Sequence, residues 1–234
     1  MAEIIPAILE KGFEGLIEKM NMVRGLVPLV QIDVCDGIFV PSKSWPYYGV
    51  NNVDDNFLKI IEEGEPFPYW DELDFEVDLM IRNPETFIDD WIAAGAKRVI
   101  VHAESTSMLS EIVAKYGKGM SQQSSVFDVE LGIAIDIKTP ETILAPYAHA
   151  ISLVQCMGIE QDGFQGQPFD ARVLEKIKRI RKAYPDLLIG VDGGVNVNTM
   201  EEMIHLGAKR FAVGSALFES DNVLVALHDF QNVS

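Results

Sequence analysis

The chain has 234 residues, of which 48% are hydrophobic and 24% charged, and this composition predicts a globular protein and excludes an intrinsically disordered one. Its formal net charge of −17 argues against a nucleic-acid partner, because binding nucleic acid relies on Lys and Arg that neutralise phosphates. The sequence has no unbroken apolar run of about 18 residues and no secretory leader at its start, so we expect a cytoplasmic protein without a membrane partner.

Short apolar runs alternate with amphipathic stretches along the chain. In chain order, the apolar runs predict eight strands, over residues 3–9, 26–34, 73–81, 98–104, 131–137, 150–159, 187–194 and 210–217. The stretches with helical spacing predict helices over residues 12–25, 56–64, 83–96, 105–117, 139–148, 170–184, 198–208 and 220–231. Repeated strand–helix units favour parallel strands with right-handed crossovers.

Eight such units in a chain of this length predict an α/β fold, namely a closed (β/α)8 TIM barrel. We expect a single barrel domain over residues 1–234, with an extended loop region around residues 41–74. The aromatic side chains of that region either cover a site or an interface, or pack the loop on itself. The two cysteines, Cys35 and Cys156, lack the spacing of a zinc site and are expected to be free thiols.

Polar side chains follow the ends of several predicted strands, where the active site of such a barrel lies. Asp33 lies at the end of the second strand, Asp78 at the end of the third and Asp192 at the end of the seventh. Several carboxylates that converge from different strands are hard to explain as structure alone, so we interpret these three as functional. Gln31 shares a strand face with Asp33.

Other polar residues near strand ends have simple structural interpretations. Asp36, which precedes Gly37, is interpreted as a turn residue whose side chain accepts hydrogen bonds from backbone amides. His102 and Glu104 share a strand face and either form a structural hydrogen-bonded pair or take part in function. Asp136 is interpreted as a cap of the next helix.

Glycines lie near the ends of the last three predicted strands and indicate a phosphate site. Gly193 and Gly194 are the last residues of the seventh strand, and Gly214 precedes Ser215 near the end of the eighth. The stretch DGFQGQPF, residues 162–169, is a third glycine-containing loop at the same end of the barrel. Backbone amides can hold a phosphate without any basic side chain, so we expect a small phosphorylated ligand despite the acidic charge.

The chain resembles the ribulose-phosphate 3-epimerases, a family of pentulose-phosphate epimerases, nearly from end to end. The motifs that carry the resemblance are IIPAIL, QIDVCDGIFVPS, FEVDLMIRNPE, VHAES, GIAIDIKTPET, MGIEQDGFQGQPF and VDGGVNVNTMEEMIHLGAKRFAVGSALF. The resemblance implies an isomerase of carbohydrate metabolism, in the pentose phosphate pathway, that interconverts ribulose phosphate and xylulose phosphate. It also implies that Asp33 and Asp192 are catalytic, one on each face of the substrate, and move a proton on and off the carbon next to the carbonyl.

The resemblance further implies a divalent metal that stabilises the enediolate, held in the family by two histidines and the two catalytic aspartates. Gln31 and Asp78 stand where the family has those histidines, so the implied metal site is Gln31, Asp33, Asp78 and Asp192. A site of oxygen ligands favours Mg²⁺ or Mn²⁺ over Zn²⁺ or Fe²⁺. Without metal, the three carboxylates would repel and at least one should stay protonated, so metal-free epimerisation is an alternative. No organic cofactor is expected.

Substrate contacts are implied by the same resemblance. Ala7 stands where the family has a serine that contacts substrate, and Asp162 stands where it has a proline. We expect the substrate or its phosphate to contact Ala7, Met157, Gly163, Gln165, Gly166, Gly193, Gly194, Gly214 and Ser215. Family members often form dimers or hexamers, so a homo-oligomer is compatible with the sequence.

Two alternative functions stay open. One is an epimerase of a different ketose phosphate, such as allulose 6-phosphate, and the other is a phosphate-binding barrel without catalysis. The decarboxylases of the same superfamily are disfavoured, because their Asp-x-Lys-x-x-Asp motif would fall on the third strand, where residues 74–78 read DFEVD and contain no lysine.

Overall fold

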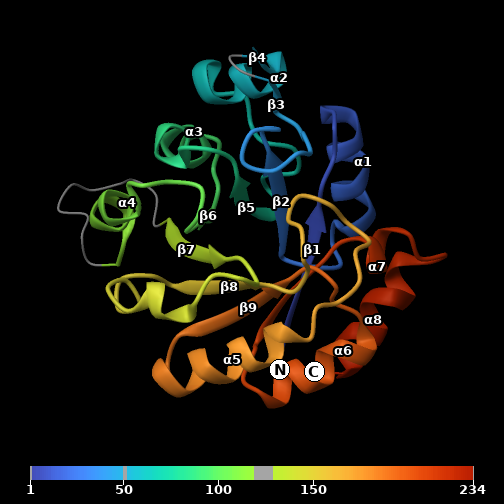
Figure 1. Ribbon diagram of the computed structural model, residues 1–234. Coiled ribbons are helices and arrows are strands. Elements are labelled where there is room, and N and C mark those ends of the chain that lie inside the picture. The colour runs from blue at the N-terminus through green and yellow to red at the C-terminus, as the bar shows by residue number, and fades with distance from the viewer. Residues whose placement is uncertain (1, 50–51, 119–128, 234) are drawn as a thin grey trace.

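The computed structural model describes residues 2–49, 52–118 and 129–233, and it contains a closed barrel of parallel strands (Figure 1). The barrel strands are β1 (Glu3–Ile8), β2 (Leu29–Cys35), β5 (Asp74–Met80), β6 (Arg98–His102), β7 (Glu130–Ile135), β8 (Leu153–Met157), β9 (Leu188–Asp192) and β10 (Arg210–Val213). Strand β1 pairs in parallel with both β2 and β10 and so closes the barrel. The predicted (β/α)8 fold is therefore confirmed.

Helices surround the barrel on its outside (Figure 1). They are α1 (Phe13–Val23), α2 (Asp55–Leu58), α3 (Ile88–Ala93), α4 (Leu109–Tyr116), α5 (Arg172–Ala183), α6 (Val197–His205), α7 (Ser215–Phe218) and α8 (Val223–Val233). In α5, the buried side chains of Val173, Ile177 and Ile180 recur at helical spacing, which explains why this stretch folds against the strands. Within the described ranges, no helix is both long enough and apolar enough to cross a membrane.

Several predicted elements differ from the structure, and for two of them the physical reason is clear. The helix predicted over residues 139–148 is only the short turn η3 (Glu141–Leu144), and Pro146 explains its end because proline has no N–H for a further helical hydrogen bond. The strand predicted over residues 210–217 ends at Val213, and α7 begins at Ser215. A short apolar run cannot by itself distinguish a strand from a helix, which accounts for the second error.

The region around residues 41–74 carries structure of its own. It contains the two-stranded antiparallel sheet of β3 (Tyr47–Gly49) and β4 (Asn52–Val53), then α2 and the π-helical turn η1 (Lys59–Glu63). The buried ring of Trp45 lies 5.2 Å from that of Phe13 in α1 and 6.0 Å from that of Trp91 in α3, measured between centroids. The Trp45 ring also contacts Phe57 and Phe67 of the same region, so its aromatic side chains pack this region on itself and, in addition, onto the outer helices.

The barrel interior has a charged layer at the N-terminal ends of its strands, where Arg98 begins β6 and Arg210 begins β10. The fully buried Glu76 accepts a hydrogen bond from Arg98 at 2.8 Å and forms an ion pair with Arg210 at 2.6 Å, both through the same oxygen, Oε2. An apolar cluster inside the barrel includes Ile100 and Leu153. The strand register places Gln31 beside Glu76 and Asp33 beside Asp78, so β5 contributes one carboxylate to each end of the barrel, whereas Gln31 bonds the carboxylates at the C-terminal end.

Glu76→Gln should lower the free energy of unfolding by about 3 kcal/mol, because it removes the buried anion that Arg98 and Arg210 share. Urea unfolding near neutral pH measures the change. Glu130→Gln is the matched control, since Glu130 pairs with the same Arg98 but its side chain is 48% exposed, and here we expect a loss below about 1 kcal/mol. Equal losses in the two variants would contradict the role assigned to Glu76.

Candidate active site

Three carboxylates meet at the C-terminal end of the barrel, as the strand ends predict. Asp33 comes from β2, Asp78 from β5 and Asp192 from β9. One ligand oxygen from each lies within 4.8 Å of the others. The side chains are nearly inaccessible, with residue exposures of 5%, 0% and 9% respectively. Three carboxylates that are buried away from water need hydrogen-bond donors from the protein.

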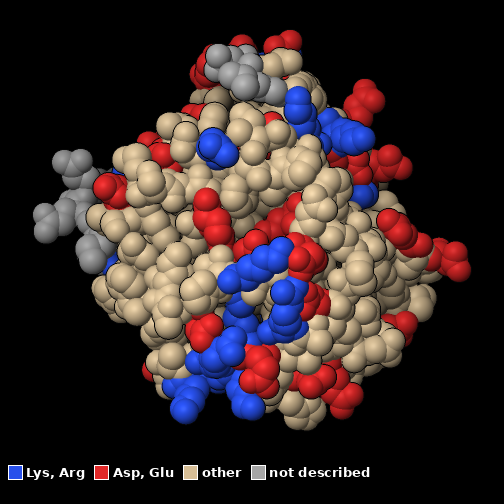
Figure 2. Space-filling view, in the orientation of Figure 1, with Lys and Arg blue, Asp and Glu red and all other residues tan. Residues whose placement is uncertain are grey.

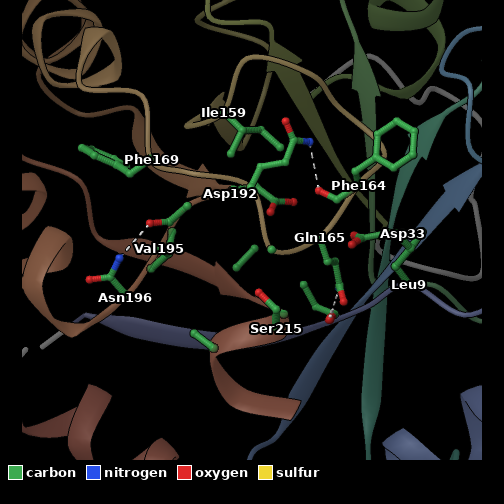
Figure 3. Close-up of a pocket in the computed structure, with 18 of the residues that line it drawn as sticks. Leu9, Asp33, Ile159, Phe164, Gln165, Phe169, Asp192, Val195, Asn196 and Ser215 are labelled. Carbon is green, nitrogen blue, oxygen red and sulfur yellow. Dashed lines mark hydrogen bonds between the residues drawn. The ribbon is translucent and has the colours of Figure 1, made fainter. Parts of the chain in front are cut away.

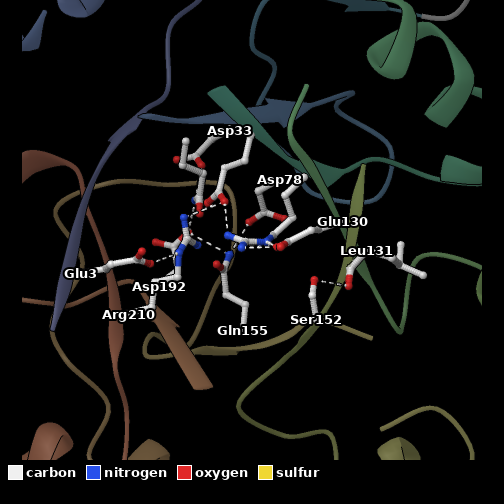
Figure 4. Close-up of polar contacts among 12 residues, drawn as sticks. Glu3, Asp33, Asp78, Glu130, Leu131, Ser152, Gln155, Asp192 and Arg210 are labelled. Carbon is white, nitrogen blue, oxygen red and sulfur yellow. Dashed lines mark hydrogen bonds and ion pairs between the residues drawn. The ribbon is translucent and has the colours of Figure 1, made fainter. Parts of the chain in front are cut away.

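Two glutamines supply those donors through their amide nitrogens (Figure 4). Gln31 Nε2 donates to Asp33 Oδ1 at 2.7 Å and to Asp192 Oδ2 at 2.6 Å. Gln155 Nε2 donates to Asp78 Oδ2 at 3.0 Å and contacts Asp192 Oδ2 at 3.3 Å. Each amide therefore bridges two carboxylates. Gln155 is not among the site residues predicted from the sequence. Its position near the end of the sixth predicted strand is the signal that could have identified it.

Burial and mutual repulsion raise the pKa values of these carboxylates. Burial is the largest cause for Asp33, whose pKa lies well above its usual value, and the charges of Asp192 and Asp78 add to it. Burial, followed by the charge of Asp78, raises the pKa of Asp192 to about 7, against the hydrogen bond from Gln31. The metal-free cluster therefore retains a proton near neutral pH, as the sequence predicts for neighbouring carboxylates.

His102, at the end of β6, lies behind the cluster and is fully buried. Its Nε2 is 3.2 Å from Asp78 Oδ1 and its Nδ1 is 3.7 Å from Asp162 Oδ2. Burial lowers the pKa of His102, but Asp78 and then Asp162 outweigh this effect and raise it to about 10. Glu104 instead accepts the backbone amide of Asp136 at 2.9 Å, so the interpretation of His102 and Glu104 as a hydrogen-bonded pair is wrong.

Asp36 has the turn role that the sequence predicts. Its Oδ1 accepts the backbone amides of Ile38 at 2.7 Å and Phe39 at 2.9 Å. Its Oδ2 accepts the amide of Arg82 at 2.8 Å, which ties the loop after β2 to the loop after β5. The two aspartates of the stretch QIDVCDG thus differ in role. Asp33 belongs to the carboxylate cluster, whereas Asp36 hydrogen-bonds the backbone of two loops.

A cavity of about 520 Å³ opens above the cluster (Figure 3). Asp33 and Asp192 line it, whereas Gln31 and Asp78 do not. All nine residues expected to contact substrate line the same cavity: Ala7, Met157, Gly163, Gln165, Gly166, Gly193, Gly194, Gly214 and Ser215. Lining residues that the sequence did not indicate include Leu9, Met80, Phe164, Phe169, Asn196 and Glu219. None of the described lining residues is Lys or Arg.

Glycine is required at two cavity positions after β9. Gly193 has φ +90° and Gly194 has φ +69°, in the left-handed region that other residues rarely adopt. A Cβ on Gly194 would also lie 2.6 Å from Phe169 Cα in the loop after β8, residues 158–171, called the β8 loop below. The two glycines therefore let these two loops approach each other and leave backbone at the cavity wall.

The β8 loop is tied to the barrel at several points. Gln165 Nε2 donates to the carbonyl oxygen of Ala7 at 3.0 Å, across to the end of β1. On the outside, Glu160 pairs with Lys138 at 2.5 Å and also with Arg172 at the start of α5. Figure 2 shows Lys and Arg side chains gathered over α5, with Asp and Glu side chains beside them. These contacts fix the loop that forms one wall of the cavity.

The group of Asp33, Asp78 and Asp192 could hold a metal ion. Three buried carboxylate oxygens at this spacing fit a hard divalent cation. Gln31 fits as a fourth ligand only with its amide reversed, because Nε2 now faces the carboxylates, while Oε1 has no hydrogen-bond partner among the described residues. The donor set therefore fits a metal through the aspartates, with Gln31 as an adaptable fourth ligand.

Comparison with known proteins places these features in context. Residues 3–218 match the sequence profile of the Ribulose-phosphate 3 epimerase family. The ribulose-phosphate 3-epimerase of Bacillus subtilis is 32% identical over 224 residues, which are 93% of this chain and 93% of that protein. That of Schizosaccharomyces pombe is 29% identical over 223 residues, covering 94% of this chain and 89% of that protein.

A solved structure supports the fold. The 3-hexulose-6-phosphate synthase from Salmonella typhimurium matches 99% of this chain and 97% of its own, with a TM-score of 0.65 and 16% identity. At this identity the similarity bears on the fold alone.

In buffer with EDTA, the free energy of unfolding should fall as pH rises from about 5 to about 8. The pKa values of Asp33 and Asp192 are raised in the folded state, so the folded protein binds more protons than the unfolded chain and loses stability as pH rises through the folded values. Asp192→Asn should flatten this fall and make the protein more stable than wild type at high pH, by about 2 kcal/mol.

Urea unfolding across this pH range measures both effects. Asp186→Asn is the control, since Asp186 is an exposed carboxylate and should leave the wild-type slope unchanged. An unchanged slope in Asp192→Asn as well would show that this carboxylate does not retain its proton in the folded protein.

Proposed function

The chain belongs to the ribulose-phosphate 3-epimerase family, and we propose that it is an isomerase that interconverts ribulose 5-phosphate and xylulose 5-phosphate. The observation that carries this proposal is the pair Asp33 and Asp192, which line one cavity from the strands β2 and β9 and are bridged by Gln31. Epimerisation next to a carbonyl needs a base on one face of the carbon and an acid on the other.

The proton chemistry follows from the two aspartates. The ionised carboxylate removes the proton from the carbon next to the carbonyl, which leaves an enediolate. The protonated carboxyl of the other aspartate then returns a proton to the opposite face and becomes the anion. The raised pKa values support this assignment, because a cluster that holds one proton near neutral pH offers one acid and one base together.

The phosphate would be held at the glycine-containing end of the cavity. Gly193, Gly194 and Gly214 expose backbone there, and Ser215 adds a hydroxyl. Since the described cavity wall has no Lys or Arg, backbone amides and neutral side chains such as Ser215 would donate hydrogen bonds to a phosphate. Gln165, which reaches from the β8 loop to Ala7, would contact the sugar.

We further propose that the site binds Mg²⁺ or Mn²⁺ in preference to Zn²⁺ or Fe²⁺. Asp33, Asp78 and Asp192 would hold the ion with Gln31 as a fourth ligand, and all four ligand atoms would be oxygens. When bound, a divalent cation supplies positive charge against the enediolate oxygens. The protein itself holds the three carboxylates close together and shields them from solvent at the bottom of the cavity.

The proposed reaction is tested by incubating the protein with ribulose 5-phosphate in deuterated water, once with EDTA and once with Mg²⁺. NMR follows the proton on the carbon next to the carbonyl and the appearance of xylulose 5-phosphate. We expect exchange and epimerisation with Mg²⁺, and a loss of about a thousandfold in Asp33→Asn and in Asp192→Asn, because each removes one of the two proton-transfer groups.

Asp186→Asn should retain full activity as an exposed control. Activity that persists in EDTA would show that the proton transfer needs no metal. If neither arm exchanges the proton, ribulose 5-phosphate is not the substrate, and a panel that includes allulose 6-phosphate then separates a changed ketose phosphate from a non-catalytic barrel.

A further inference from the structure

Asp162, His102 and Asp78 form a buried row behind the reacting carboxylates. The imidazole of His102 lies between two carboxylates, with Nε2 3.2 Å from Asp78 Oδ1 and Nδ1 3.7 Å from Asp162 Oδ2. Side-chain exposures are 0% for His102 and Asp78 and 7% for Asp162. None of the proton-transfer steps above uses His102 or Asp162.

The two ends of this row belong to different parts of the molecule. Asp78 is part of the barrel strand β5, whereas Asp162 lies in the β8 loop next to the cavity-lining stretch that begins at Gly163. Gly163 is packed so closely on Ser42 and Val40 that a Cβ there would lie 2.5 Å from Ser42 Oγ. The loop position and the carboxylate cluster are thus connected through one side chain, the imidazole.

Asp78 has a close polar neighbour at each of its oxygens. Gln155 donates a hydrogen bond to Oδ2 at 3.0 Å, whereas Oδ1 lies 3.2 Å from His102 Nε2 as an ion-pair contact and has no hydrogen-bond partner among the described residues. The hydrogen bond from Gln155 and the fully buried imidazole next to Oδ1 together restrict the rotation of this carboxylate, and so set its direction toward Asp33 and Asp192. A carboxylate on each side of the ring also requires an N–H on each ring nitrogen if both are to be satisfied.

We propose that Asp162 and His102 are positioning residues: together they orient Asp78 toward Asp33 and Asp192, and they couple that orientation to the position of the β8 loop. The proposal rests on the proposed function, because it concerns the same carboxylates, but its test uses no turnover. It assigns to Asp162 an effect on metal binding, although Asp162 is not itself a ligand.

The first measurement is the affinity of the purified protein for Mn²⁺ alone, by calorimetry or by electron paramagnetic resonance. Asp162→Asn keeps the size of the side chain and removes its charge, and we expect about tenfold weaker Mn²⁺ binding, the effect typical of a residue that orients a ligand. Glu104→Gln is the matched control, because Glu104 follows β6 two residues after His102 and bonds a backbone amide, and it should bind Mn²⁺ like wild type.

The second measurement is hydrogen–deuterium exchange of the β8 loop in EDTA, where no metal contributes. Asp162→Asn and Asp78→Asn should both speed exchange in this loop, because each removes one end of the same row. A merely local role for Asp162 predicts no effect of Asp78→Asn on the loop. This arm decides the proposal even if the wild-type chain binds no Mn²⁺.

Faster loop exchange in both variants, with unchanged exchange in Glu104→Gln, would support the coupling. Loop exchange that is unchanged in Asp78→Asn, or Mn²⁺ affinity that is unchanged in Asp162→Asn while wild type binds the ion, would overturn it. Failure of the epimerase assay would leave these results standing, so the two proposals fail separately.

Discussion

The burial of three like charges at one end of the barrel is the constraint on which the rest of the site depends. Carboxylates that lose their water need other donors, and the barrel supplies them from neighbouring strands. Gln31 and Gln155 each place one amide nitrogen between two carboxylates, while His102 faces the third from behind. The same N–H groups that relieve the repulsion also fix the directions of the acids, so charge compensation and preorganisation have one structural cause.

A carboxylate is also buried at the other end of the barrel, where its charge is compensated in a different way. There, Glu76 lies between two guanidinium groups, and the compensation is by ion pairs instead of by neutral amides. The ion pairs place positive charge directly against Glu76, whereas the amide bridges at the other end carry no charge, and the pKa of Asp192 is raised there to about 7 by burial and by the charge of Asp78. The two ends of one set of strands thus differ in chemistry because they differ in the donors that oppose the acids.

Much of this could be predicted from the sequence. The strand–helix alternation predicts the barrel, and the strand-end positions predict that Asp33, Asp78 and Asp192 converge, because both follow from local periodicity. The partners of His102 could not be predicted, since Asp162 reaches it from a loop whose path depends on packing against distant residues. Nor could the sequence predict that Gln31 turns its Nε2 toward the carboxylates, because this orientation depends on which neighbouring atoms accept its N–H groups.

The absence of Lys and Arg from the described cavity wall has a consequence for how an anionic ligand reaches it. With a net charge of −17, the protein repels a phosphate ester at long range, and no basic side chain in that wall offsets the repulsion. Added salt shortens the range of that repulsion. Encounter should therefore become faster as ionic strength rises, the reverse of the behaviour of proteins that draw anions in with positive charge.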